Sequence, residues 1–237
     1  MYFVYETRTL YSCQVVSEKL TRAAVLERAA KLADADGLDA VTIRRLAQEL
    51  GVTPMALYWH FKNKDELLVG LVDHLLSGVT ADRQAGDPWP KQLRAMVEAL
   101  LDVVRAHPTL VELLMFIDKR HATAFTRATN DALDLLGQAG FDLEESFWVS
   151  SYLLHGVIGM VEARPGCPSS MSPAEAEEWR RQRRVQLESL PADQFPMMVA
   201  FAATFGHEPD LDRYFAFGVN LLMSGVEAMA AQRAARA

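Results

Sequence analysis

The sequence predicts an all-α protein, with a small three-helix unit near the N-terminal end and a larger helical domain after it. Apolar residues recur at spacings of three and four along most of the 237 residues, which is the period of a helix. No sustained run alternates apolar and polar residues between turn signals, as a strand would. Half of the residues are hydrophobic and 23% are charged, which suffices for one large or two modest globular domains.

Turn-forming residues divide the chain into three predicted segments. Residues 1–20 are rich in Tyr, Phe and Val without a clear period, and they form an N-terminal extension that is either an arm or disordered. The cluster ADRQAGDPWP, which begins at Ala81, combines Gly, Asp and Pro and is the best domain boundary. It separates a head, residues 21–80, from a body, residues 81–237.

Capping signals predict three helices in the head. The first runs from about residue 21 to DADGLD, where Gly37 supplies the left-handed residue that ends a helix. Thr42 is expected to cap IRRLAQEL, which ends at Gly51. Thr53 then caps a seven-residue helix, PMALYWH, with Pro54 at the first helical position, where its missing N–H has no partner to lose.

A connecting helix and six body helices are expected after the head. Asn63 and Glu66 have the spacing of a capping box, and the helix they open carries an apolar stripe of Leu68, Val72, Leu75 and Val79. The body helices are expected at roughly 89–106, 109–120, 122–139, 143–163, 174–190 and 210–233. Between Arg164 and Pro196 the sequence predicts a loop followed by a solvated, charged helix.

Charge is distributed unevenly along the chain. The formal net charge is −7, which by itself argues against a nucleic-acid partner. Residues 1–64, however, carry nine Lys and Arg against seven Asp and Glu, whereas residues 65–237 carry fifteen against twenty-four. The local excess within residues 42–64 comes from four cations against Glu49 alone: Arg44, Arg45, Lys62 and Lys64. Such a patch can meet phosphates although the whole protein is acidic.

Two short helices joined by a tight turn at Gly51 have the arrangement of a helix-turn-helix, whose second helix enters the major groove of DNA. On the second helix, Leu57 and Phe61 fall on the side that faces the preceding helix. Met55 and Tyr58 fall on the outer side, and Trp59 either joins them or packs into the core of the head. An exposed aromatic face needs a partner, and a DNA groove supplies thymine methyl groups, sugars and phosphates.

The cations of the head fit the same docking. Arg44, near the start of the preceding helix, can donate two hydrogen bonds to a guanine edge. Lys62 and Lys64 suit phosphates, and Lys64 lies at a helix N-terminus that already favours an anion. Because one short recognition helix reads few base pairs, a dimer on a symmetric site is expected.

The stretch TIRRLAQELGVTPMALYWHFKNKDELL resembles the DNA-binding head of the tetracycline-repressor (TetR) family. Weaker similarity continues through PWPKQL, QAGFDLEESFWVSSYLLHGVIGMVEA and DRYFAFGVNLLMSGVEAM. The resemblance implies a homodimer with a helix-turn-helix head and a ligand-binding and dimerisation body, which binds a palindromic double-stranded DNA operator and is released by a small-molecule inducer. The alternative is a DNA-binding dimer whose body mediates protein contacts. A cytoplasmic location is expected from the composition.

The resemblance also assigns roles within the head. Arg44 matches a base-contacting arginine, while Met55 occupies a recognition position at which the tetracycline repressors have proline, so the operator sequence stays open. Tyr58, His60 and Lys64 match backbone-contacting positions. The complete set of DNA-binding candidates is Thr42, Arg44, Arg45, Thr53, Pro54, Met55, Ala56, Tyr58, Trp59, His60, Lys62 and Lys64.

The inducer is expected to differ from that of the tetracycline repressors, which hold a magnesium–drug chelate with polar and imidazole groups. Three matching positions fall on Met96, Leu100 and Leu114, and the carboxylate position falls on Ala163. Apolar side chains cannot hold a hydrated magnesium chelate. We therefore expect a mainly apolar or aromatic inducer, bound without metal or cofactor between the helices of residues 89–163. The candidate ligand-binding residues, each of which is otherwise an ordinary core or dimer residue, are Met96, Leu100, Leu114, Phe116 and His155.

Two glycine-notched helices, around Gly156/Gly159 and Gly218/Gly225, predict close helix packing. They pair either across a dimer as a four-helix bundle or within one chain. Both readings need small residues where two backbones approach each other.

Other classes of protein lack support in the sequence. Cys13 and Cys167 lie far apart without a CxxC motif or a His at metal-ligand spacing, so neither a disulfide framework nor a zinc site is expected. No HExxH, GxSxG, phosphate-binding loop or dinucleotide fingerprint indicates an enzyme. The longest apolar stretches fall short of the roughly 20 residues that a membrane span needs, and no N-terminal signal peptide is recognisable.

Overall fold

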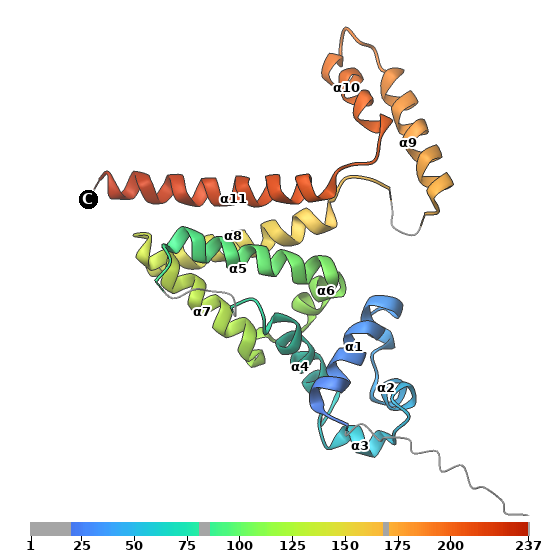
Figure 1. Cartoon of the computed structure of the whole chain (residues 1–237), viewed down its shortest axis with the longest axis vertical. Helices are drawn as coiled ribbons and strands as arrows, with labels where there is room; N and C mark the ends of the chain where they lie inside the picture. Colours follow the sequence, from blue (N-terminus) through green and yellow to red (C-terminus); the bar gives the residue numbers. More distant parts are fainter. Residues whose placement is uncertain (1–19, 81–85, 168–170, 237) are drawn as a thin grey trace, which may run out of the picture.

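The computed structural model describes residues 20–80, 86–167 and 171–236, and within these ranges all regular structure is helical (Figure 1). The side chains of Phe116 and Arg120 are outside this description. The prediction of an all-α fold with a helix-turn-helix head and a larger helical body is confirmed. The predicted N-terminal extension, and Cys13 within it, lies outside the described residues apart from Leu20.

The head and its connecting helix form one end of the molecule (blue to green in Figure 1). Leu46, Leu57 and Phe61 are completely buried between the helices of the head. The third helix ends at Tyr58, two residues earlier than predicted, and beyond it the backbone N–H groups of His60 and Phe61 both donate to the Leu57 carbonyl. The elements are α1 Arg22–Asp36, the 3₁₀ helix η1 Leu38–Ala40, α2 Ile43–Glu49, α3 Pro54–Tyr58 and α4 Lys64–Leu76.

Each α-helix of the head begins at a side-chain cap, whose oxygen accepts the backbone N–H three residues later. Such a bond satisfies one of the N–H groups that a helix leaves free at its start. At the start of α4 the predicted capping box differs in one bond, because the Glu66 carboxylate accepts the N–H of Lys62, at 2.9 Å, in place of that of Asn63. The four caps are Thr21, Thr42, Thr53 and Asn63.

The body packs α5, α7 and α8 against one another, and α11 lies along α5 and α8 (Figure 1). Helix α6 ends at Phe116, four residues earlier than predicted, and a 3₁₀ helix, η2 Lys119–His121, follows it. The body helices are α5 Trp89–Ala106, α6 Thr109–Phe116, α7 Thr123–Gln138, α8 Leu143–Glu162 and α11 Leu211–Ala234. Helix α4 touches both α1 of the head and α7 of the body, so it joins the two domains.

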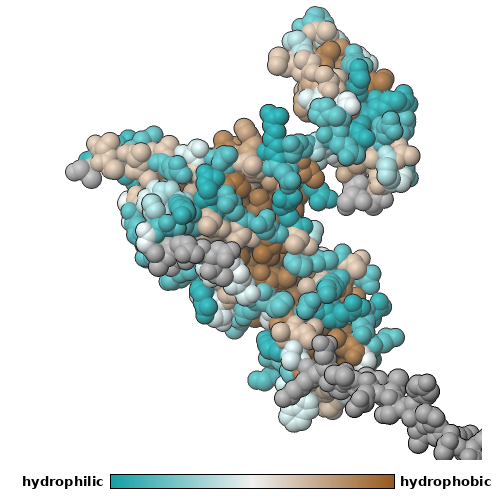
Figure 2. Space-filling view, viewed as in Figure 1, coloured by the Kyte–Doolittle hydropathy of each residue, from teal (hydrophilic) through white to brown (hydrophobic). Residues whose placement is uncertain are grey.

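Residues 173–206, which we term the projecting segment, stand away from the body (Figures 1 and 2). The segment contains α9 Pro173–Glu188, α10 Pro196–Phe201 and the 3₁₀ helix η3 Ala202–Gly206. Trp179 of α9 packs on Phe205, with ring centroids 6.0 Å apart, and Phe205 packs edge-on against Phe201. The sequence predicted α9 as a solvated helix but did not predict α10 or η3.

Glycines set the close approach of α8 and α11. A Cβ atom at Gly156 would lie 2.8 Å from Leu222, and one at Gly218 would overlap Met160, so these two glycines serve packing within the chain. Gly159 and Gly225, in contrast, face open space. Intrachain packing therefore explains one glycine on each helix and leaves the other unexplained.

Helix α11 is also notable for its length. Among the described helices it alone is long and apolar enough, by length and composition, to cross a membrane. The sequence had predicted that every apolar stretch is too short to span a membrane, and by length and composition this prediction is wrong for α11. In the fold, α11 packs against α5 and α8 and buries Phe215, Val219 and Met223.

Candidate nucleic-acid interface and ligand cavity

The outer face of α3 carries large apolar side chains in solvent. Trp59 is 87% exposed, Met55 68% and Tyr58 50%. On the opposite side of the same helix Leu57 is fully buried. Packing of Trp59 into the core of the head, one of the two readings of the sequence, is therefore wrong. The exposed face is the surface on which a helix-turn-helix protein meets a DNA groove.

The four cations within residues 42–64 fall into two groups. The side chains of Arg44 and Lys62 are exposed and form no ion pair or hydrogen bond with any residue that the structure describes. Arg45 is held within the head, since its Nε donates to Glu49 at 2.8 Å and its Nη2 reaches Asp36 at 3.4 Å. Lys64 is half-buried, and its Nζ lies 3.4 Å from the Leu38 carbonyl oxygen. Of these four cations, only the side chains of Arg44 and Lys62 thus have no partner among the described residues.

The remaining head candidates lie on or beside the same two helices. Thr42 and Thr53 use their hydroxyl oxygens as the caps of α2 and α3. Pro54 is exposed at the first position of α3, while Ala56 and His60 are half-buried. A residue that the sequence analysis missed supports this region: Arg22 of α1 donates to the His60 carbonyl at 3.0 Å and stacks on the ring of Phe61.

Glu49 connects α1 and α2 beneath the outer surface. Its two carboxylate oxygens face Arg45 at 2.8 Å and Arg28 at 2.6 Å. The hydrogen bond from Arg45, with a further contribution from Arg28, lowers the pKa of the Glu49 carboxyl from its ordinary value. Glu49 therefore stays charged at neutral pH and neutralises part of the positive patch expected from the sequence.

A polar contact joins the head directly to the body. The carboxylate of Asp34, on α1, lies 2.6 Å from Nδ1 of His107 and accepts a hydrogen bond from the Thr109 hydroxyl, also at 2.6 Å. His107 ends α5, and Thr109 begins α6. The contact thus fixes the head against the turn that leads into a cavity-lining helix.

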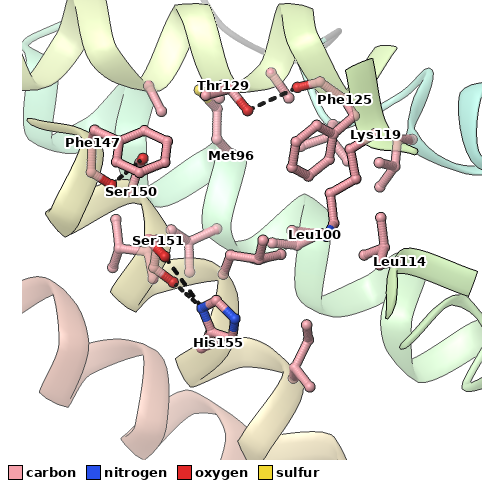
Figure 3. Close-up of a pocket in the computed structure, with 18 of the residues that line it drawn as sticks. Met96, Leu100, Leu114, Lys119, Phe125, Thr129, Phe147, Ser150, Ser151 and His155 are labelled. Atoms are coloured by element: carbon pink, nitrogen blue, oxygen red, sulfur yellow. Dashed lines mark hydrogen bonds between the residues drawn. The ribbon is translucent and has the colours of Figure 1, made fainter. Parts of the chain in front are cut away.

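The body contains a partly open cavity of about 300 Å³, lined from α4 to α8 (Figure 3). This volume is at the lower end of the range for small-molecule sites. Most of the lining is apolar, and its larger members include Met96, Leu100, Leu114, Phe125, Phe147 and Leu154. The polar lining residues are Lys119, Thr129, Ser150, Ser151 and His155.

Four of the five ligand candidates line this cavity: Met96, Leu100, Leu114 and His155. The side chain of the fifth, Phe116, lies outside what the structure describes. Ala163, which matches the carboxylate position of the tetracycline repressors, is the C-cap of α8 and does not line the cavity. The described lining residues include no carboxylate at all. Lys119, Phe125 and Phe147 also line the cavity, but no periodicity or motif distinguished them in the sequence.

A helix-turn-helix head with an exposed aromatic face, joined to a helical body that contains an apolar cavity, defines a class of DNA-binding transcriptional regulators. Residues 25–71 match the family model "Bacterial regulatory proteins, tetR family", and residues 82–230 match "Tetracyclin repressor-like, C-terminal domain". Because the second match alone covers more than half of the chain, the protein belongs to the TetR family of transcriptional regulators. Its work is regulation of transcription and not catalysis of a reaction.

Individual relatives agree with this assignment. The chain is 30% identical over 221 residues to the HTH-type transcriptional repressor DrrR1 of Streptomyces coeruleorubidus, covering 90% of this chain and 80% of that protein. It is 29% identical over 220 residues to the class C tetracycline repressor of Escherichia coli, covering 89% and 92%. Among solved structures, ActR of Streptomyces coelicolor in complex with actinorhodin is similar with a TM-score of 0.69 and 30% identity, covering 89% of this chain and 98% of ActR.

Proposed function

We propose that the protein is a cytoplasmic repressor, which binds a palindromic operator as a homodimer and releases it when a mainly apolar, aromatic molecule enters the cavity without a metal ion. The observation that carries this proposal is the pairing of an exposed α3 surface with an apolar cavity of about 300 Å³ in the same chain. The contact of Asp34 with His107 and Thr109 supports a mechanical link between the two.

Selection of bound sequences from random duplexes tests the DNA-binding part, and an inverted repeat is expected. Arg44→Ala should relax the preference at one base pair in each half-site and cost about 1–3 kcal/mol. Lys62→Ala should weaken all duplexes alike and reduce the salt dependence of binding. Lys31→Ala, a change on α1 that removes only a local pair with Glu27, serves as the control. Enrichment of no inverted repeat would contradict the proposal.

Dimerisation through α8 and α11 is supported by their outer faces. Trp148 and Tyr152 on α8, and Phe217 and Leu221 on α11, are 51–75% exposed. The open glycines, Gly159 and Gly225, fall on the same helices. Large exposed apolar faces of this kind mark sites of association, and a two-fold contact uses the same patch on both subunits.

A substitution on the outer face of α11 tests the dimer. Leu221→Asp, at a position that is 65% exposed, should produce monomers that keep their helical content and lose operator binding. Leu222 is not a suitable site for this test, because it packs on Gly156 within the chain. Light scattering that still records a dimer would move the interface elsewhere.

Metal independence follows from the chemistry of the lining. Magnesium prefers oxygen ligands, carboxylates above all, and the cavity-lining residues that the structure describes include no Asp or Glu. A lipophilic aromatic compound should release the protein–operator complex in the presence of EDTA. Release by micromolar tetracycline only when magnesium is present would refute this.

The alternative function, in which the body mediates protein contacts, predicts a different result. If the cavity binds no small molecule, the compound should release neither the unaltered protein nor Leu100→Trp from operator. If the cavity is the sensor, the compound should release the unaltered protein, whereas Leu100→Trp, which fills the cavity, should bind operator and stay bound. Melting temperatures with and without compound separate the two readings.

A further inference from the structure

One cation stands alone in the apolar cavity. Lys119 is the only Lys, Arg, Asp or Glu among the described residues that line it. Its side chain is half-buried and reaches into the cavity beside Leu100 and Leu114 (Figure 3). No ion pair or side-chain hydrogen bond joins its ammonium group to a residue that the structure describes. An ammonium group partly removed from water beside leucines gains most from an anion that shares the same cavity.

Two of the hydroxyl groups that line the cavity have already used their hydrogens. The Thr129 hydroxyl donates to the Phe125 carbonyl at 2.9 Å, and the Ser150 hydroxyl donates to the Phe147 carbonyl at 2.9 Å. A hydroxyl has a single hydrogen, so what each has left for a ligand is acceptor lone pairs. These two residues therefore complement a hydroxyl group of the ligand and not a carbonyl.

His155 has the same polarity. Its Nδ1 lies 2.7 Å from the Ser151 carbonyl oxygen, which can only accept, so Nδ1 carries the hydrogen of the neutral ring. The other ring nitrogen, Nε2, is then an acceptor. Figure 3 shows the ring of His155 across the cavity from Thr129 and Phe125. The lining thus offers one cationic donor, Lys119, acceptors at Thr129, Ser150 and His155, and a Ser151 hydroxyl whose hydrogen is not used by His155 Nδ1.

Aromatic side chains supply the remaining feature. Phe125 from α7 and Phe147 from α8 line the cavity together with Met96, which suits flat aromatic rings. We propose that the inducer is a hydroxylated aromatic acid, whose carboxylate pairs with Lys119 and whose hydroxyl group donates to His155 or Thr129. This inference rests on the proposed function of the cavity as an inducer site and adds to it the ligand's charge and the placement of its donors.

Matched naphthalene probes test the inference on the full-length protein. The probes are a hydroxynaphthoic acid, its methyl ester, which lacks the charge, and the corresponding methoxynaphthoic acid, which lacks the donor. By calorimetry at neutral pH the acid should bind about tenfold more tightly than the ester. Lys119→Met should abolish that difference while leaving the affinity for the ester unchanged. The control is Lys91→Met, because Lys91 is exposed on α5, pairs with Asp87 and does not line the cavity.

The outcomes separate the inference from the proposed function. If acid and ester bind equally, if the preference survives in Lys119→Met, or if no probe binds, the inference is overturned. If the methoxy acid binds as tightly as the hydroxy acid, the assignment of acceptors is wrong. An ester that binds as tightly as the acid and releases operator would overturn the inference alone. An acid that binds through Lys119 without releasing operator would support the pairing of a carboxylate with Lys119 and refute the proposed function of the cavity as an inducer site.

Discussion

The head and the projecting segment hold their helices in different ways. All four α-helices of the head begin at a side-chain cap. Their apolar faces pack together and bury Leu46, Leu57 and Phe61 completely. In the projecting segment α9 is capped by Ser172, but α10 has no side-chain cap, and Met197 stays 78% exposed. The difference shows that caps can fix a helix locally, whereas a closed core requires several apolar stripes that face one another.

A core truncation in each region should give the largest contrast. Leu57→Ala removes a fully buried side chain of the head and should lower the free energy of unfolding by about 2–5 kcal/mol. Met197→Ala, in the projecting segment, should change it by less than about 0.5 kcal/mol. Urea unfolding followed by circular dichroism measures both. Similar losses in the two variants would mean that Met197 is covered in solution.

The next largest difference is expected between the polar contacts that join each region to its neighbours. Asp34→Ala removes the acceptor of His107 and Thr109 at the junction of head and body, and it should cost about 1–2 kcal/mol. Glu208, which pairs with Arg180 of the projecting segment, is 77% exposed, so Glu208→Ala should cost no more than about 0.5 kcal/mol. Thermal unfolding measures the stability of both variants. If Asp34→Ala lowers the melting temperature as little as Glu208→Ala does, Asp34 does not fix the head.

Loss of a helix cap should have a smaller effect, and one that differs in extent between the regions. Thr53→Ala removes the cap of α3 and should lower the global free energy of unfolding by about 1 kcal/mol. Ser172→Ala removes the cap of α9 and should accelerate amide hydrogen exchange within that helix, with little change in global unfolding. Exchange that accelerates equally in the head of the Ser172 variant would contradict this separation.

Titration of the acidic partners should have the smallest consequence. A hydrogen bond from Arg181, followed by one from Gln182, lowers the pKa of Glu178 to about 2. Since this folded-state pKa is below the ordinary value near 4.3, any stability that Glu178 contributes is present above that value and is lost as the pH falls toward 2. Carbon-detected NMR of the carboxyl group measures the midpoint, and Arg181→Ala should return it to the ordinary range. A midpoint unchanged by that variant would exclude Arg181 as the cause.

The same contrast explains how much of the structure the sequence could predict. Thr42, Thr53 and Gly51 act through bonds and dihedral angles within a few residues, so their positions in the sequence sufficed. Helix α10 has no side-chain cap and lies in a short, continuously apolar run, which carries no helical period.

The cavity residues also fall into those that the sequence could predict and those that it could not. Met96, Leu100 and Leu114 could be found because they match ligand positions of the family that the sequence resembles. Lys119 could not, because the sequence placed it within a predicted helix at 109–120, whereas α6 ends at Phe116 and Lys119 lies in η2. The acceptor character of His155 depends on a bond to Ser151 that only coordinates reveal. Sequence also could not tell which glycines of α8 and α11 face each other.

The exposure of Trp59 has a spectroscopic consequence. The four tryptophans of the chain lie in different places, at the end of α3, the start of α5, the outer face of α8 and α9: Trp59, Trp89, Trp148 and Trp179. A variant that keeps Trp59 alone, with Phe at the other three positions, should fluoresce like a solvated indole, because 87% of that residue is in water. Base pairs that cover the ring would change its emission, so this side chain can report operator occupancy optically, without an attached dye.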